Sequence, residues 1–267
     1  TPVTVAGGHE FASISTGYQH GCGMTTAGTP YCWGFNGYGQ IGDGTTTNVS
    51  SPTAVSDLAT VDQISADAYT SCAVASGDGY CWGYNAYGAL GDGTTTARST
   101  PSMVIGGSTW SRVLAGYQIG CGVSSDDTPY CWGYTPYVGD GSTLDQPTPT
   151  SVLGGHTFTD IDAGNALTCA TTGSESYCWG NNSSGELGQG DFEPRSEPAQ
   201  ITTVSMDRVA AGLNHACGLT SAGDAYCWGE NGYGQLGDGT TTDSDVPVAV
   251  NAGFTFSEIL VGAYHTC

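Results

Sequence analysis

The sequence has 267 residues, with 43 glycines, 11 cysteines, no lysine, four arginines and a formal net charge of −21. Its apolar runs fall far short of the 18 or so residues that a membrane span needs, and it lacks helical periodicity. Such acidity repels nucleic-acid phosphates and anionic lipids, so we expect neither as a partner. An excess of negative charge suits a soluble secreted protein, or a protein that attracts cations or a basic partner.

One unit of about 49 residues recurs along the whole chain. Its most constant part is the tetrapeptide Tyr-Cys-Trp-Gly, which begins at Tyr31, Tyr80, Tyr130, Tyr177 and Tyr226. We treat residues 1–267 as one tandem repeat domain, with units at about 11–60, 61–109, 110–157, 158–205 and 206–255, and a partial sixth unit at 256–267.

Each unit reads as short strands joined by tight turns. Apolar residues predict a first strand, at 11–14, 110–113, 158–161 and 256–259 in four of the units. In the first unit a second strand is expected at 18–24 and a third at 31–35. A Gly-Asp-Gly loop with a threonine run then leads to a proline that blunts or ends a fourth strand. This predicts an all-β chain, with units closer to propeller blades than to β-helix coils.

The cysteines fall into five close pairs and one left over. Spacings of eight or nine intervening residues match neither a redox Cys-x-x-Cys nor a zinc site. They match a disulfide across the hairpin of the second and third strands, worth about 2–3 kcal/mol each. The predicted disulfide residues are Cys22 with Cys32, Cys72 with Cys81, Cys121 with Cys131, Cys169 with Cys178, and Cys217 with Cys227. So many cysteines favour an extracellular or cell-surface location.

The last cysteine, Cys267, would find its partner about ten residues further on. The first and the last 22 residues are also the same part of the repeat: 2–5 aligns with 247–250, 11–14 with 256–259, and 17–22 with 262–267. We therefore expect the chain to be cut from a longer repeat protein.

The repeated motifs resemble those of the regulator of chromosome condensation repeat family. The pattern Gly-x-x-His-x-Cys, followed by Tyr-Cys-Trp-Gly-x-Asn-x-x-Gly-Gln-Leu-Gly-x-Gly, covers nearly the whole chain. The resemblance implies a β-propeller, usually of seven blades, so that five full repeats would be part of such a ring or of a longer array. Family members include nucleotide-exchange factors, partner-binding modules and a secreted β-lactamase inhibitor, so the fold alone names no activity. The paired cysteines and the absence of lysine are similar to the secreted, disulfide-containing, bacterial-type branch, and argue against a chromatin or exchange role.

Two loops depart from the consensus and are candidates for recognition, because loops over a constant scaffold usually carry it. The third repeat is two residues shorter, and the fourth replaces its Asp-Gly loop. The candidate residues are Tyr134, Pro136, Tyr137, Phe192 and Arg195. Neutral drift in a tolerant loop is the alternative explanation.

Other repeated residues have a chemical and a structural interpretation. The tryptophan of each tetrapeptide would stack on sugars or pack between blades, and packing is the commoner role of one large ring per blade. Histidines 20, 215 and 265 stand where other repeats have Thr, Ile or Leu, which suits packing better than a metal site, and His9 and His156 lie in loops expected to be exposed. Asp43, Asp92, Asp140 and Asp238 each sit between two glycines, which favours a turn over a calcium loop.

Asn48, Asn181 and Asn182 fit the N-glycosylation rule in predicted loops, and the threonine runs would accept O-glycans. We find no nucleophile elbow, phosphate-binding loop or carboxylate pair, and predict no enzyme activity, catalytic residue, metal or cofactor.

These observations favour an acidic, secreted or surface-displayed scaffold that binds a protein or glycan at its loop rim, as in adhesion or recognition. The alternative is a structural subunit that associates with copies of itself in an extracellular fibre or surface assembly. The identity of the partner does not follow from the sequence.

Overall fold

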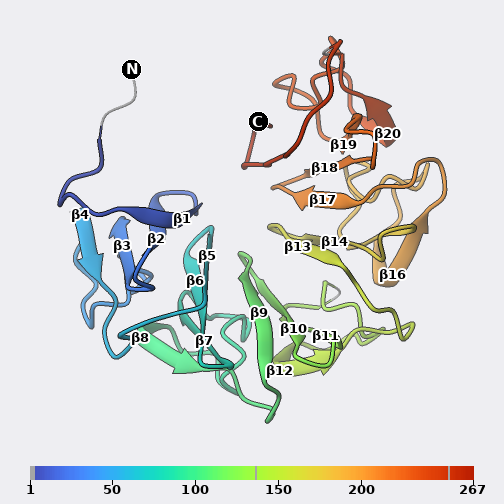
Figure 1. The fold of residues 1–267 in the computed structure, drawn as a ribbon. Helices are drawn as coiled ribbons and strands as arrows, with labels where there is room; N and C mark the ends of the chain where they lie inside the picture. The colour runs from blue at the N-terminus through green and yellow to red at the C-terminus, as the bar shows by residue number, and fades with distance from the viewer. Residues whose placement is uncertain (1–3, 136, 252) are drawn as a thin grey trace. The chain divides into compact units, whose positions relative to one another are not determined.

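A computed structural model describes residues 4–135, 137–251 and 253–267, which form twenty strands and no helix (Figure 1). The strands make five antiparallel sheets of four, each in sequence order, because short connections join neighbouring strands. The first sheet contains β1 (Phe11–Thr16), β2 (His20–Thr25), β3 (Pro30–Gly34) and β4 (Val49–Ala54); the second contains β5 (Gln63–Asp67), β6 (Thr70–Ala75), β7 (Asp78–Gly83) and β8 (Arg98–Met103).

The remaining three sheets repeat this meander. They contain β9 (Trp110–Ala115), β10 (Ile119–Ser124), β11 (Pro129–Gly133) and β12 (Gln146–Ser151); β13 (Asp160–Ala163), β14 (Leu167–Thr171), β15 (Ser176–Gly180) and β16 (Arg195–Ile201); and β17 (Arg208–Ala211), β18 (His215–Leu219), β19 (Ala225–Gly229) and β20 (Ser244–Ala249). The expected all-β chain of four-stranded units is thus confirmed. No helix among the described residues is long and apolar enough to cross a membrane.

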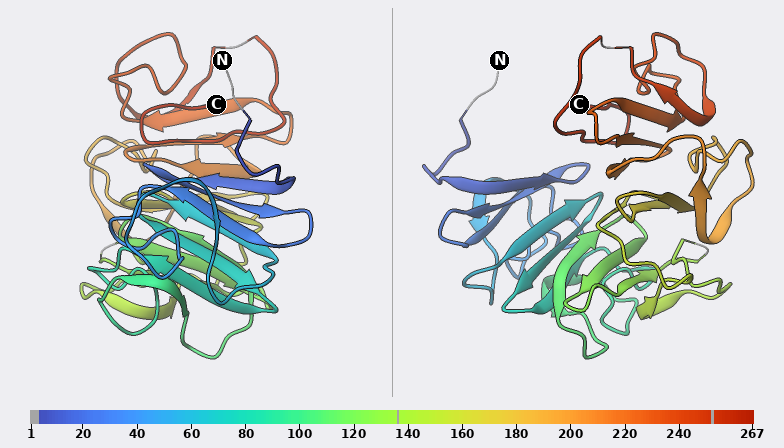
Figure 2. Two further views of the ribbon diagram at one scale, coloured as in Figure 1. Left: turned by 90° about the vertical axis from the view of Figure 1, so that its left-hand side faces the viewer. Right: turned by 45° about the vertical axis from the view of Figure 1, so that its right-hand side comes forward.

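The chain divides into two compact units. The first unit holds the chain up to Tyr134 together with Asp145–Pro149, and the second holds Thr135–Leu144 and Thr150–Cys267. Figure 2 shows, from two further sides, the twisted meander in the blue and teal sheets of the first unit and in the orange sheets of the second.

The disulfides lie in the central hairpin of each sheet. Cys22 of β2 stands directly opposite Cys32 of β3, and the equivalent cysteines face each other in the same register in the other four sheets. All five predicted pairs are bonded. All ten bonded cysteines are fully buried. Each bridge therefore joins two adjacent strands of one repeat, and the exposed Cys267 is a free thiol.

Several of the expected strand positions are wrong. Of the two roles expected for the prolines, ending the fourth strand does not occur: Pro52 lies inside β4, and Pro101 inside β8. These strands are sheet edges, where a proline nitrogen that faces outward removes no ladder bond. The strand expected at 158–161 begins two residues later, as β13. The one expected at 256–259 does not form, and the strand pairing after it is a single isolated bridge between Val261 and Thr266.

Tryptophans link each repeat to the one before it. Trp82 is fully buried, and its indole N–H donates to the backbone oxygen of Gln40 in the preceding repeat at 2.9 Å. The indole rests against Gly42, whose φ is +78° and whose added Cβ would lie 2.6 Å from the ring nitrogen. Trp132, Trp179 and Trp228 make the equivalent bond to Ala89, Tyr137 and Glu186. A packing role accounts for this tryptophan row, because four of its five indoles have no exposed ring face for a sugar.

Candidate binding surface

The described residues of the recognition loop expected in the third repeat each have a local role in their own unit. Tyr134, in the first unit, packs against Tyr87 with ring centroids 4.7 Å apart. Tyr137, in the second unit, is half-buried and its backbone oxygen accepts the Trp179 indole N–H at 3.1 Å. Pro136 lies outside the described residues. The short loop of the third repeat therefore serves the packing of the fourth.

The loop of the fourth repeat keeps the shape of its counterparts despite its different sequence. The buried Asn182 donates to the backbone oxygens of Asp191 and Glu193, as Asn85 donates to those of Thr94 and Thr96. Arg195 pairs with Asp191 at 2.7 Å, as Arg98 pairs with Asp92 in the second repeat. Phe192 remains 58% exposed, so this loop presents an aromatic ring to solvent.

The hydrogen bonds around these asparagines also bear on the candidate calcium-loop aspartates and on the candidate glycosylation sites. Asp43 accepts from the backbone N–H of Thr45 at 2.9 Å, and Asp238 does the same for Thr240, so these carboxylates are used as turn formers. No group of metal-ligating side chains occurs in the described part of the chain. Asn182 is fully buried and its amide nitrogen is in use, so a glycan there does not fit the folded chain. Asn48 is exposed and Asn181 half-buried.

Two histidines connect neighbouring repeats. His20 Nε2 lies 2.9 Å from Ser71 Oγ of the next repeat, and that hydroxyl donates to the backbone oxygen of Gln40 at 2.9 Å. His215 contacts Thr266 in the same way, at 3.1 Å. Burial lowers the pKa of both His20 and His215 to about 4. Both are therefore neutral packing groups at physiological pH.

The loop histidines were expected to be exposed, and this was wrong. His9 packs against Tyr31 with ring centroids 4.1 Å apart, and His156 packs against Tyr177 at 4.3 Å, each pair with tilted ring planes. Both rings are half-buried because a double-glycine turn folds them back onto the sheet.

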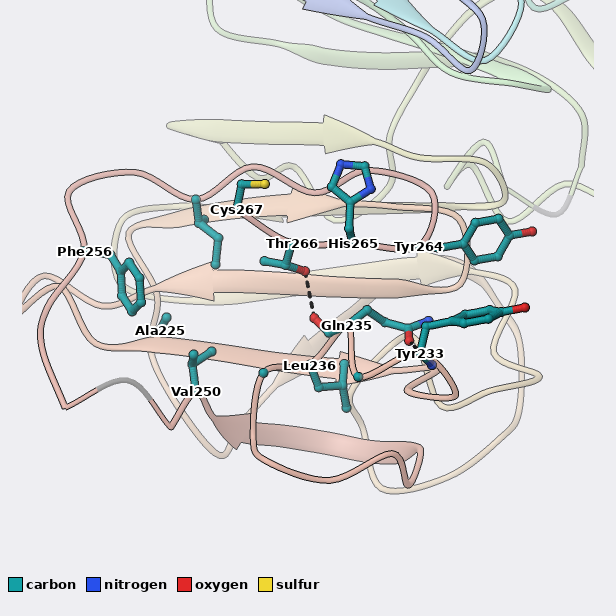
Figure 3. Close-up of a pocket in the computed structure, with 13 residues that line it drawn as sticks. Ala225, Tyr233, Gln235, Leu236, Val250, Phe256, Tyr264, His265, Thr266 and Cys267 are labelled. Carbon is teal, nitrogen blue, oxygen red and sulfur yellow. Dashed lines mark hydrogen bonds between the residues drawn. The ribbon is translucent and has the colours of Figure 1, made fainter. Parts of the chain in front are cut away.

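A cavity of about 320 Å³ lies on the fifth sheet, beside Gln235, Leu236 and Gly237 (Figure 3). These residues correspond to Gln40, Ile41 and Gly42, against which the Trp82 indole rests in the first unit. In Figure 3 the Thr266 hydroxyl reaches the backbone oxygen of Gln235, at 2.9 Å, as Ser71 reaches Gln40. The cavity is thus the tryptophan slot of the repeat, and packing explains its shape.

The most distinctive exposed feature is a group of six rings in the first unit, here called the aromatic cluster. Eight pairs of these rings have centroids between 5.2 and 6.3 Å apart. Its members are Tyr18, Phe35, Tyr38, Tyr69, Tyr84 and Tyr117, from three consecutive repeats.

Turn geometry brings these rings together. Tyr18, Tyr69 and Tyr117 lie in the turns that precede β2, β6 and β10. Phe35 directly follows β3, which ends at Gly34 with a φ of +112°; an added Cβ there would lie 2.4 Å from the backbone oxygen of Gln19. The chain therefore leaves the sheet at this glycine, and the Phe35 N–H donates to Gln19 at 2.8 Å.

The cluster is open to solvent. Tyr18 is 38% exposed and Tyr38 40% exposed, and the other four rings are half-buried. Burial raises the pKa of Tyr84 and of Tyr117, and the phenols of neighbouring tyrosines raise it further. The phenol groups therefore converge and stay neutral at physiological pH. Within the described residues, the hydroxyls of Tyr38, Tyr69, Tyr84 and Tyr117 make no hydrogen bond.

Sequence reasoning missed this cluster, because it placed Tyr18 in a strand expected at 18–24 and Phe35 in one expected at 31–35. A usable signal was present. The tripeptide Gly-Tyr-Gln occurs at 17–19 and again at 116–118, and its glycine favours a turn at these positions.

Comparison with known proteins identifies the repeat. A family model described as the regulator of chromosome condensation (RCC1) repeat matches residues 27–74, 76–123, 175–219 and 222–267, and a second model of this repeat matches 11–40 and 207–235. No curated protein sequence matches the chain significantly.

Solved structures share the fold at low sequence identity. Human WBSCR16 has a TM-score of 0.88 at 21% identity, covering 100% of this chain and 74% of that one. The crystal structure of Kap60 bound to yeast RCC1 (Prp20) gives 0.81 at 20%, with 96% and 67% covered. The ectodomain of the receptor kinase CR4 from Physcomitrella patens gives 0.59 at 23%, with 96% and 57% covered.

These likenesses establish a propeller-type fold and leave the activity open, since every identity is below 25%. The family models cover well over half of the sequence, and their repeats coincide with the disulfide-linked sheets. The chain therefore belongs to the regulator of chromosome condensation repeat family.

Proposed function

We propose that this chain is an extracellular or cell-surface, non-enzymatic propeller scaffold that binds a partner protein or glycan through the aromatic cluster. The observation that carries the proposal is the cluster itself: six adjoining, partly exposed rings on turns held by a rigid disulfide-linked scaffold. Tyrosine offers a large, amphipathic contact area at low conformational cost, and is enriched in binding surfaces.

Two findings support the extracellular location and the protein-binding role in this proposal. Five disulfides are consistent with an oxidising, extracellular compartment. Solved relatives of this fold bind proteins: yeast RCC1 (Prp20) is bound to Kap60, and Prp20p from Saccharomyces cerevisiae has been studied for its binding to Gsp1p and histones. We carry over protein binding from these relatives, and not a nucleotide-exchange reaction.

The test compares the wild type with a Tyr38→Leu/Tyr84→Leu variant on arrays of extracellular proteins and glycans. The control is Tyr233→Leu, because Tyr233 occupies the place of Tyr38 in the fifth repeat, is 75% exposed, and lies outside the cluster. We expect array members bound by the wild type and the control, and lost by the cluster variant, with equal melting temperatures for all three.

Sedimentation velocity tests the alternative, a self-assembling structural subunit. Particles that grow with protein concentration, together with array binding that is the same for the wild type and the cluster variant, would favour the fibre and contradict the proposal.

A further inference from the structure

The aromatic cluster also constrains the chemistry of its partner. We propose that the cluster binds a protein segment that presents arginine or lysine side chains, held by cation–π contacts on the ring faces. This inference rests on the proposed function and narrows it from proteins or glycans to basic protein segments.

Charge supplies the first reason. The first unit has ten Asp and Glu residues against two arginines, Arg98 and Arg112, for a net charge of −8; the second unit contributes −13, giving −21 in all. Arg98 is tied to Asp92 at 2.7 Å. With no lysine in the chain, the first unit as a whole is negative, and such a charge accelerates the approach of cationic partners and repels anionic ones.

Ring geometry supplies the second reason. Six of the eight cluster pairs cross at steep angles, between 55° and 82°. Such a surface is faceted rather than flat, so ring faces point in different directions. Flat sugar rings stack best on a platform of coplanar rings, whereas a guanidinium or ammonium group can sit over any one face within about 6 Å of its centroid.

The phenol groups supply the third reason. The hydroxyls of Tyr38, Tyr69, Tyr84 and Tyr117 make no hydrogen bond within the described residues, so they are available to a partner. A neutral phenol can accept a hydrogen bond from an Arg or Lys N–H. Ring faces and phenol oxygens together suit a basic side chain with an apolar stem.

The experiment measures fluorescence anisotropy with a labelled Gly-Arg octapeptide as the probe. A Gly-citrulline octapeptide keeps its shape without charge, and chitohexaose and cellohexaose serve as neutral glycans. The protein variants are Tyr38→Leu/Tyr84→Leu, which removes two rings and keeps apolar volume, Tyr38→Phe/Tyr84→Phe, which keeps the rings, and the matched Tyr233→Leu control.

We expect the arginine peptide to bind the wild type, the Phe variant and the control within about threefold, and the Leu variant at least about tenfold more weakly. Binding should weaken between about 20 and 150 mM salt, as the negative field is screened. The citrulline peptide should bind at least about tenfold more weakly than the arginine peptide.

Three results would overturn the inference. Equal binding of the arginine peptide to all variants would show that only the overall charge attracts it. Cluster-dependent binding of a neutral glycan without binding of the peptide would assign the surface to sugars, and would leave the proposed function intact. No binding of any probe, combined with arrays that lack a cluster-dependent partner, would refute the proposed function as well.

Discussion

The two units present different chemistry on the same turns. In the first unit the turn before the second strand carries Tyr18 or Tyr117, and the position after the third strand carries Phe35 or Tyr84. In the second unit the same positions carry Asn165, Leu213, Asn181 and Glu230. The backbone is the same in both units, so the side chains placed on it decide what each surface can bind.

The second unit uses its polar residues internally. Asn214 donates to Glu230 at 3.2 Å, and Asn181 donates to the buried Glu186. Burial raises the pKa of Glu186, and the charge of nearby Glu230 raises it further. A surface whose amides and carboxylates pair with one another has less to offer a partner than one with free phenols and open ring faces.

The largest expected effect tests whether the scaffold really is equivalent in both units. Trp132 and Trp228 are both fully buried, with indole N–H bonds of 2.8 Å to the preceding repeat. Replacement of either by alanine should lower the free energy of unfolding by about 3–5 kcal/mol. Urea unfolding measures it, with the exposed Phe192→Ala as a control near zero. A clearly smaller loss at one site would mean that the two units are packed differently.

The disulfides give a second matched pair. Cys72–Cys81 in the first unit and Cys169–Cys178 in the second each close a loop with a sequence separation of 9. Replacing both cysteines of one bridge by alanine should cost about 2–3 kcal/mol in either unit, since loop entropy depends on loop length. Non-reducing peptide mapping of the wild type is the companion measurement, and bridges between different repeats would refute the assignment.

Each unit also has one buried histidine, and these predict a pH dependence. The pKa of His20 and His215 falls from 6.5 to about 4 on folding. Between these two pH values the unfolded chain therefore binds protons at these histidines, and the folded chain does not. Their contribution is fully present above pH 6.5 and declines as the pH falls toward 4, by about 2–3 kcal/mol for each.

Urea unfolding at pH 7 and pH 4.5 should show this decline, and His20→Asn should be less sensitive to pH than the wild type. His215→Asn should behave alike, because both rings bond a hydroxyl of the next repeat. If neither variant changes the pH dependence, the histidines do not titrate as described.

The smallest expected effect concerns calcium. The Gly-Asp-Gly loops of both units use their aspartates to hold backbone N–H groups, as Asp43 does for Thr45 and Asp238 for Thr240. A chelator should therefore leave the melting temperature unchanged within about 2 °C. A fall of more than about 10 °C that calcium reverses would reveal ligands beyond these loops, since such a shift corresponds to several kcal/mol in a chain of this size.

Much of the fold was predictable from local sequence. The Tyr-Cys-Trp-Gly repeats and the cysteine spacing located the central hairpins, because facing cysteines in a two-strand ladder must keep a fixed separation. The exact ends of strands were less predictable. Pro52 was expected to blunt or end the fourth strand. It lies inside β4, where it is tolerated because β4 is an edge strand, and only the sheet order reveals that.

The sequence alone determined the repeat, the all-β class, the disulfide pairs and the acidic charge, since these depend on residue types and on contacts between near neighbours. Only the tertiary structure decided where the aromatic cluster, our proposed binding surface, lies. Tyr18, Tyr69 and Tyr117 are about fifty residues apart, and become neighbours because consecutive sheets pack with their turns in register. The same packing buried the row of tryptophans and removed it as a sugar-binding surface, because each buried indole rests against the repeat before it.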